Sequence, residues 1–199
     1  LQACWMIPAD CETAIDGFWQ EVPGSKLLNT LRQGFSDLPI VAEDLGVITP
    51  EVTELRQRFE LPGMAVVQFA FDEFEDNPHK PANITPDEVA YSGTHDNNTT
   101  RGWFDTLDAE AQRFVLEMLE GGEDGDIVEL MNRRVLETEA NLAILPLQDI
   151  LGLGADSRMN TPGETEDNWT WRFDWSQLSE EQANHLRHLI EQTGRRYEG

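Results

Sequence analysis

The most constraining feature of this sequence is a series of short apolar runs that alternate with helix-like segments and end at polar turns. The runs lie at residues 39–43, 64–71, 89–94 and 141–147. Apolar runs of about four to eight residues bounded by turn signals are typical of strands buried in a parallel sheet. Their alternation with helices predicts an α/β fold, in which helices pack outside a parallel sheet.

Helix-period spacing and end signals place helices between and after these runs. Thr49 is suited to cap a helix that has Pro50 at its first position, and Ser179 with Gln182 forms a capping box. In the first expected helix the apolar side chains fall on one side: Leu27, Leu28, Leu31 and Phe35. The expected helices span residues 25–35, 49–59, 109–119, 127–139 and 182–192.

Two of the apolar runs end in carboxylates. Residues 40–46 have the sequence IVAEDLG, and residues 89–98 have the sequence VAYSGTHDNN. In a (β/α)8 barrel the carboxyl ends of all strands open onto one face, where the catalytic groups lie. Two carboxylates brought together there can do acid–base and electrostatic work on a glycosidic bond. Glu43 and Asp96 are therefore the candidate catalytic residues; the alternative is that they are strand-end caps without chemistry.

The chain length limits the size of this barrel. A complete (β/α)8 barrel needs roughly 250 residues, whereas this chain has 199. Four strand candidates make about half of a barrel, and the chain begins at Leu1, with a Trp5–Pro8 segment typical of the interior of a longer sequence. We expect residues 1–199 to form the C-terminal half of one catalytic (β/α)8 barrel domain whose N-terminal part is missing.

The composition excludes several classes of partner. A net charge of −24 repels nucleic acid and anionic membranes, but it leaves binding of a neutral sugar unaffected. Lys26 and Lys80 are the only lysines, so the acidity fits either adaptation to a salty cytoplasm or simply an acidic protein. No apolar run approaches the roughly 18 residues of a membrane span. We expect a cytoplasmic protein.

The sequence predicts neither a metal site nor a cofactor. Cys4 and Cys11 have no zinc-ligand spacing, so we expect two ordinary thiols rather than a metal site or a disulfide. The acidic, glycine-rich stretch 121–126 is superficially like a calcium loop. Gly122 and Met131, however, stand where such a loop needs oxygen ligands, which predicts a solvated turn.

Four segments carry a specific family resemblance. They are IVAEDLGVITPEV, LPGMAVVQFAF, YSGTHDNNTTRGW and LPLQDILGLGADSRMNTPGE, followed by NWTWR. In this order and spacing they resemble the C-terminal part of the 4-α-glucanotransferases, the amylomaltase or disproportionating-enzyme family (glycoside hydrolase family 77). The resemblance implies a retaining α-glucan transferase on a (β/α)8 barrel, acting on α-1,4-glucans without a cofactor.

The resemblance also implies roles for individual residues. Glu43 matches the acid/base, and Asp96 matches the carboxylate that stabilises the transition state. His95 would donate a hydrogen bond to the same sugar ring. Phe69 matches an aromatic of a sugar subsite, although an ordinary core phenylalanine is an equal alternative, and Trp5 matches an aromatic of the acceptor-side loop. The family's aspartate nucleophile lies upstream of the segment that resembles residues 5–8, so we expect it before Leu1.

Other residues of these segments are assigned supporting roles. Asp44 is expected to be structural, and Arg158 and Asn160 are expected to support the site. Trp169 and Trp171 are expected to pack rather than to serve as platforms for sugar rings. Two departures from the family pattern are Cys4, where many relatives have an aromatic, and Ala82, where relatives often have a histidine. The alternatives left open are an α-glucan hydrolase and a non-catalytic glucan-binding or structural remnant.

Overall fold

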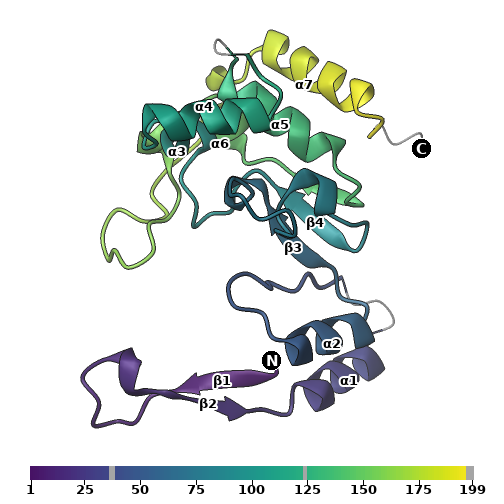
Figure 1. Ribbon diagram of the computed structural model, residues 1–199, viewed down its shortest axis with the longest axis vertical. Helices are drawn as coiled ribbons and strands as arrows, with labels where there is room; N and C mark the ends of the chain where they lie inside the picture. The colour runs from purple at the N-terminus through teal and green to yellow at the C-terminus, as the bar shows by residue number, and fades with distance from the viewer. Residues whose placement is uncertain (36–38, 123–124, 196–199) are drawn as a thin grey trace. The chain divides into compact units, whose positions relative to one another are not determined.

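The chain folds into two units. The computed structural model describes residues 1–35, 39–122 and 125–195 (Figure 1). The first unit comprises Leu1–Met64 and the second Ala65–Gly199.

The first unit begins with a β-hairpin that the sequence pattern did not predict. Strands β1 (Ala3–Met6) and β2 (Phe18–Glu21) pair antiparallel, with Trp5 opposite Trp19. The two indole rings meet edge to face at 5.2 Å. Cross-strand aromatic pairs of this kind stabilise a hairpin.

Two helices follow, close to the predicted positions. They are α1 (Gly24–Gly34) and α2 (Pro50–Arg58), with Pro50 at the first turn as expected. Leu28 of α1 and Leu55 of α2 form one buried apolar cluster with Phe59 and Leu61, which follow α2. The predicted apolar side of the first helix is only partly buried, because Leu27 and Phe35 are exposed.

The strand predicted at residues 39–43 is wrong. In the described part of the chain this run is not a strand, and Ala42 N donates one hydrogen bond to Pro62 O at 2.8 Å. A strand requires a ladder of such bonds with a neighbour, and apolar composition alone does not supply one.

The other three predicted runs form a three-stranded sheet. Its strands are β3 (Gly63–Val66), β4 (Glu88–Tyr91) and β5 (Leu142–Ile144), with β4 in the middle. Strands β4 and β5 are parallel, with Val89 opposite Leu142. The predicted parallel sheet with helices is therefore confirmed, although each strand is shorter than its apolar run. Strand β3 ends at Val66 because the next residues, Val67–Phe69, turn into a 3-10 helix.

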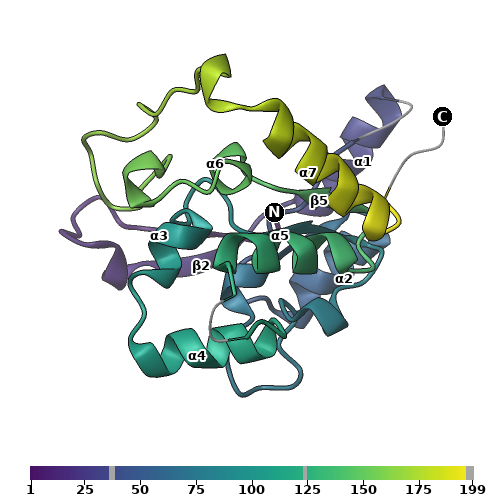
Figure 2. The same cartoon turned by 90° about the horizontal axis from the view of Figure 1, so that it is seen from above.

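Helix α5 (Ile127–Glu137) packs on this sheet, and other helices lie around it. The predicted α4 (Ala109–Met118), α5 (Ile127–Glu137) and α7 (Glu180–Gln192) are confirmed, whereas the short α3 (Thr100–Phe104) and α6 (Leu147–Ile150) were not predicted. The capping box at Ser179 is formed as expected. Helix α7 lies beside α5 (Figure 2), and Arg133 of α5 donates a hydrogen bond to Gln192 of α7.

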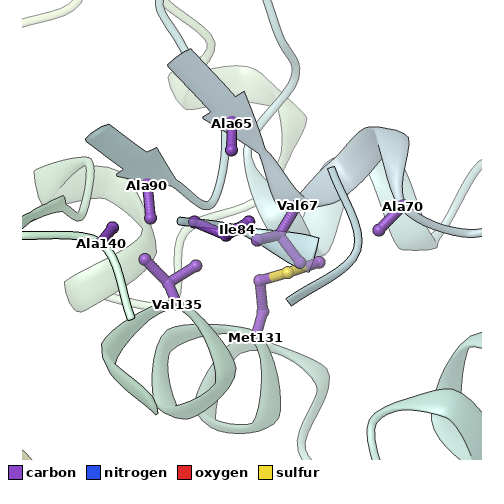
Figure 3. Packing of buried hydrophobic residues seen from close by; sticks show 8 residues of the cluster. All are labelled: Ala65, Val67, Ala70, Ile84, Ala90, Met131, Val135 and Ala140. Atoms are coloured by element: carbon purple, nitrogen blue, oxygen red, sulfur yellow. The ribbon is translucent and has the colours of Figure 1, made fainter. Parts of the chain in front are cut away.

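Side chains of β3, β4 and α5 form the main core of the second unit. Figure 3 shows Met131 and Val135 of α5 facing Ala65 and Ala90 of the strands, with Ile84 between them. A second cluster joins α4 to α5: Val115, Leu116, Leu119, Ile127 and Val128. The first cluster joins α5 to the sheet whose strand ends carry the candidate site, and the second joins α5 to α4.

Several smaller expectations can be compared with the described residues. Cys4 and Cys11 are free thiols. Within residues 1–35, 39–122 and 125–195 no three His, Cys, Asp or Glu side chains are grouped to hold a metal ion, and no helix is long and apolar enough to cross a bilayer. The turn expected at residues 121–126 lies partly outside the described residues, since 123–124 are not described.

Candidate active site

The candidate site of the second unit lies in the loop that follows β4. This loop contains His95 and Asp96, as the sequence predicted, and it ends at Thr99, whose hydroxyl caps α3 by accepting from Gly102 N. The Asp96 side chain is 45% exposed. The strand and helix that flank the loop are fixed in the core, while the carboxylate itself faces solvent.

Three residues hold Asp96. Asn160 Nδ2 donates to Asp96 Oδ1 at 2.6 Å, and Arg158 Nη2 donates to the backbone oxygen of Asp96 at 2.6 Å. His95 Nε2 lies 3.3 Å from Asp96 Oδ1. Asn160 N also donates to His95 O at 3.1 Å. Arg158 and Asn160 therefore have the supporting position that was expected of them. They fix Asp96 through one carboxylate oxygen and its backbone.

Hydrogen bonds within the loop and from Gln68 also hold its backbone in place. Asn97 Oδ1 accepts hydrogen bonds from Thr94 N and Thr94 Oγ1, both at 2.9 Å. Gln68 Nε2 donates to Asn98 O at 3.0 Å. A Cβ atom at Gly93 would lie 2.9 Å from Gln68 Nε2, so a side chain at this position would displace the Gln68 amide from its place. These contacts set the direction in which His95 and Asp96 leave the strand.

A buried carboxylate that the sequence analysis did not single out lies behind the loop. Asp149 is 1% exposed. It accepts hydrogen bonds from Ser92 Oγ at 2.6 Å and from Thr100 N and Thr100 Oγ1 at 2.8 Å. Ser92 and Thr100 lie on either side of the loop that carries Asp96. Asp149 thus joins both ends of the loop to α6. Its sequence signal is the one used for Glu43 and Asp96, an acid after an apolar run.

Phe69 lies at the end of the 3-10 turn after β3. The residue is 47% exposed, and its ring meets the His79 imidazole edge to face at 5.4 Å. Asn77 Nδ2 donates to Phe69 O at 2.8 Å and fixes the backbone there. The exposed ring does not belong to the core, so the core alternative is wrong, and an aromatic surface is available to a ligand.

Glu43 and Asp44 lie side by side in the first unit, in different environments. Asp44 forms an ion pair with Arg56 Nε at 3.1 Å and accepts from Met64 N at 2.8 Å. A Cβ atom at Gly63 would lie 2.6 Å from Asp44 Oδ2. Glu43 is exposed, and among the described residues its carboxylate has no hydrogen-bond or ion-pair partner. Asp44 has the contacts of a structural residue, whereas the exposed Glu43 carboxylate is available to a ligand.

Trp5 also belongs to the first unit. Its Nε1 donates to Ala14 O at 2.8 Å, so the indole is fixed on the hairpin while part of it is exposed. The structure therefore brings His95 and Asp96 together with Arg158 and Asn160 in the second unit. Glu43 and Trp5 belong to the first unit.

Comparison with known proteins defines the family of this chain. The sequence profile described as 4-alpha-glucanotransferase matches residues 1–178. The chain belongs to the 4-alpha-glucanotransferase family. It is 43% identical to the 4-alpha-glucanotransferase of Thermus thermophilus over 201 aligned positions, which cover 98% of this chain and 40% of that protein. The 4-alpha-glucanotransferase of Synechocystis is 45% identical, with 98% of this chain and 39% of that protein covered.

A solved structure of the same family has a similar fold. The amylomaltase from Streptococcus agalactiae in complex with acarbose matches with a TM-score of 0.91 at 34% identity, covering 97% of this chain and 39% of that one. The chain thus spans about two-fifths of the length of the 4-alpha-glucanotransferases that it matches. These matches establish the family and the α/β fold.

Proposed function

We propose that this chain forms the C-terminal half of a (β/α)8 barrel in a 4-α-glucanotransferase, which moves α-1,4-glucan segments between maltodextrins with retention of configuration. The observation that carries the proposal is the Asp96 arrangement. A half-exposed carboxylate leaves the end of a strand, and Arg158, Asn160 and His95 fix its position. Membership of the family supports transfer over other carbohydrate chemistry. The cytoplasmic location stays a prediction.

In this proposal the reaction is a double displacement. A nucleophilic carboxylate, expected outside this chain, attacks the anomeric carbon, and the bond from that carbon to the leaving glycosidic oxygen breaks. Glu43 gives its proton to that oxygen. Glu43 then takes the proton from the 4-hydroxyl of the acceptor glucan, whose oxygen attacks the anomeric carbon and releases the nucleophile. The exposed carboxylate of Glu43 suits both proton transfers.

In the same proposal Asp96 and His95 contribute to stabilising the transition state by electrostatics. The reacting sugar ring gains positive charge in the oxocarbenium-like transition state. An Asp96 carboxylate that hydrogen-bonds to sugar hydroxyls would stabilise this charge more strongly than it stabilises the ground state. Asn160 and His95 hold one oxygen of Asp96, and part of the carboxylate stays exposed for the sugar.

The test uses a full-length protein that contains this chain. Incubation with maltotriose should give longer and shorter glucans while the number of reducing ends stays constant, because transfer breaks one glycosidic bond for each one formed. An increase in reducing ends would instead indicate a hydrolase. No turnover together with retained glucan binding would indicate a non-catalytic glucan-binding protein. The 199-residue chain alone should show no transfer, since it supplies only two of the three proposed carboxylates.

A further inference from the structure

An exposed tryptophan lies beside the candidate site in a position that packing does not explain. The Trp169 ring centroid lies 5.1 Å from that of the His95 imidazole, at an interplanar angle of 38°. The residue remains 54% exposed. A tryptophan that serves only packing buries most of its large apolar surface. Trp169 therefore presents much of its indole to solvent next to His95.

The backbone around Trp169 is held in an unusual conformation. Asp167 and Trp169 have φ angles of 60° and 61°. Residues other than glycine rarely adopt this left-handed region, and such positions persist only where surrounding contacts fix them. Asn168 supplies those contacts: its Oδ1 accepts from Thr161 N at 2.8 Å, and its Nδ2 donates to Glu164 O at 3.0 Å.

The connection after α6 contains Trp169 and also binds Asp96. Trp169 N donates to Met159 O at 2.8 Å. Met159 lies between Arg158 and Asn160, the two residues that bind Asp96. The long connection after α6 thus returns on itself (Figure 1) and fixes the indole at a defined place relative to His95 and Asp96.

We propose that Trp169 is a stacking platform for a glucose ring of the bound α-1,4-glucan, next to the ring that His95 and Asp96 contact. The inference rests on the proposed function. A pyranose ring has an apolar C–H face that packs on an indole, and its hydroxyls remain free for polar partners. A neutral sugar is also compatible with the net charge of −24. Trp169 acts in binding and takes no part in proton transfer.

The test compares four variants of the full-length protein. Trp169→Ala removes the platform, and Trp169→Phe keeps a smaller ring. Trp169→Gly also removes it, and suits the backbone because glycine adopts a φ of 61° without strain. Trp175→Ala is the matched control, since Trp175 is 79% exposed and packs on Phe173 instead of near the site. Binding of maltoheptaose is measured by calorimetry, with each variant combined with Glu43→Gln so that the sugar is not consumed.

The expected results differ between the variants. Trp169→Ala and Trp169→Gly should raise the Kd for maltoheptaose roughly three- to tenfold. Trp169→Phe should give an intermediate Kd, and Trp175→Ala an unchanged one. If Trp169→Ala does not fold, as judged by circular dichroism, the glycine variant supplies the measurement. In the otherwise unchanged enzyme, Trp169→Ala should raise KM more than it lowers kcat.

Three results would overturn the inference. One is an unchanged Kd in both Trp169→Ala and Trp169→Gly, and another is no binding of maltoheptaose by the protein without a Trp169 substitution. The third is a fall in kcat with no change in Kd, which would make Trp169 a positioning residue for His95. Calorimetry does not depend on turnover. A protein that binds maltoheptaose through Trp169 but transfers no glucan would therefore disprove the proposed function alone.

Discussion

The two units of this chain hold their candidate catalytic residues in different ways. In the first unit, α1 and α2 have no side-chain hydrogen bond at their N-caps, and one cluster of apolar residues is buried among the described residues. In the second unit, aspartate side chains cap α4 and α5, and two apolar clusters among the described residues pack α5 against the sheet and against α4.

The same contrast extends to the carboxylates themselves. Asp96 is fixed by Asn160, Arg158 and His95, all in its own unit. Glu43 has no polar partner among the described residues, and only its neighbour Asp44 is bound, to Arg56 and Met64. The difference fits the proposed roles. An acid/base must exchange its proton with two different oxygens, whereas a stabilising carboxylate must stay in one place.

The largest effect is expected at Glu43. Because this side chain makes no polar contact within the described residues, Glu43→Gln should leave the stability of the full-length protein unchanged. Turnover of maltotriose should nevertheless fall by roughly 10²–10⁴-fold, since an amide cannot transfer the proton. Initial rates and a thermal melt measure both quantities.

A donor with an activated leaving group provides the control for Glu43. Such a leaving group needs no protonation, so the first step should recover in Glu43→Gln while the transfer to an acceptor remains slow. Near-normal turnover of maltotriose by this variant would remove Glu43 from the mechanism.

The second effect tests the fixed carboxylate. Asp96→Asn keeps one acceptor oxygen and loses the negative charge, so kcat and kcat/KM should fall together, by on the order of 10²-fold. Binding of unreacted maltoheptaose should change little. A sharp rise in KM at constant kcat would make Asp96 a plain binding residue, and no change in either quantity would contradict its assignment.

Sequence patterns located most of this architecture because many of its determinants are local. Helices α4, α5 and α7 follow from apolar spacing, with the Ser179 capping box as a further signal for α7, and each forms near the expected residues. Glu43 and Asp96 were found as acids after apolar runs. For residues 39–43 the same pattern was misleading, because a strand depends on a hydrogen-bonding neighbour that its own sequence does not specify.

The features that escaped prediction depend on contacts between distant residues. The β1–β2 hairpin pairs Trp5 with Trp19 across a long connection without a tight-turn signal. Asn160 reaches Asp96 across 64 positions of sequence, and Asp149 reaches Ser92 across 57. Such pairs become visible only when the sheet and its helices are assembled.

The third prediction concerns the hydrogen-bond network around the buried Asp149. Asp149→Ala would leave the Ser92 and Thr100 hydroxyls and Thr100 N without their buried acceptor. The free energy of unfolding of the full-length protein should fall by about 3 kcal/mol. Asp149→Asn is the matched variant, and it should cost less because hydroxyl groups can rotate to accept from the amide. Urea unfolding measures both; equal stability of the alanine variant and the parent would show that the network does not hold the unit.

The smallest effect distinguishes the helix caps of the two units. Asp126 Oδ1 accepts from Val128 N at 2.9 Å and Glu129 N at 3.1 Å, and Oδ2 accepts from Arg101 Nη2 at 3.0 Å. Asp126→Ala should therefore cost about 1 kcal/mol of unfolding free energy. Thr49→Ala, at the N-cap of α2, should cost less, since Thr49 makes no side-chain capping bond.

The cap at Asp126 also predicts a pH dependence. Burial raises the pKa of the Asp126 carboxyl. The hydrogen bond from the backbone N–H of Glu129 and the charge of the Arg101 guanidinium together lower it by more than burial raises it, so this pKa lies below its usual value. A lowered pKa in the folded state means that the carboxylate stabilises the protein fully above the unfolded-state pKa of about 4. This stabilisation is lost as the pH falls through the lower folded-state pKa. The difference in unfolding free energy between the parent and Asp126→Asn, measured by urea unfolding, should therefore be largest near neutral pH and shrink below about pH 4.

Added salt should reduce the same difference in unfolding free energy, because Arg101 and Asp126 are partly exposed. A difference that is constant across pH and salt would show that the cap acts by hydrogen-bond geometry alone, without its charge.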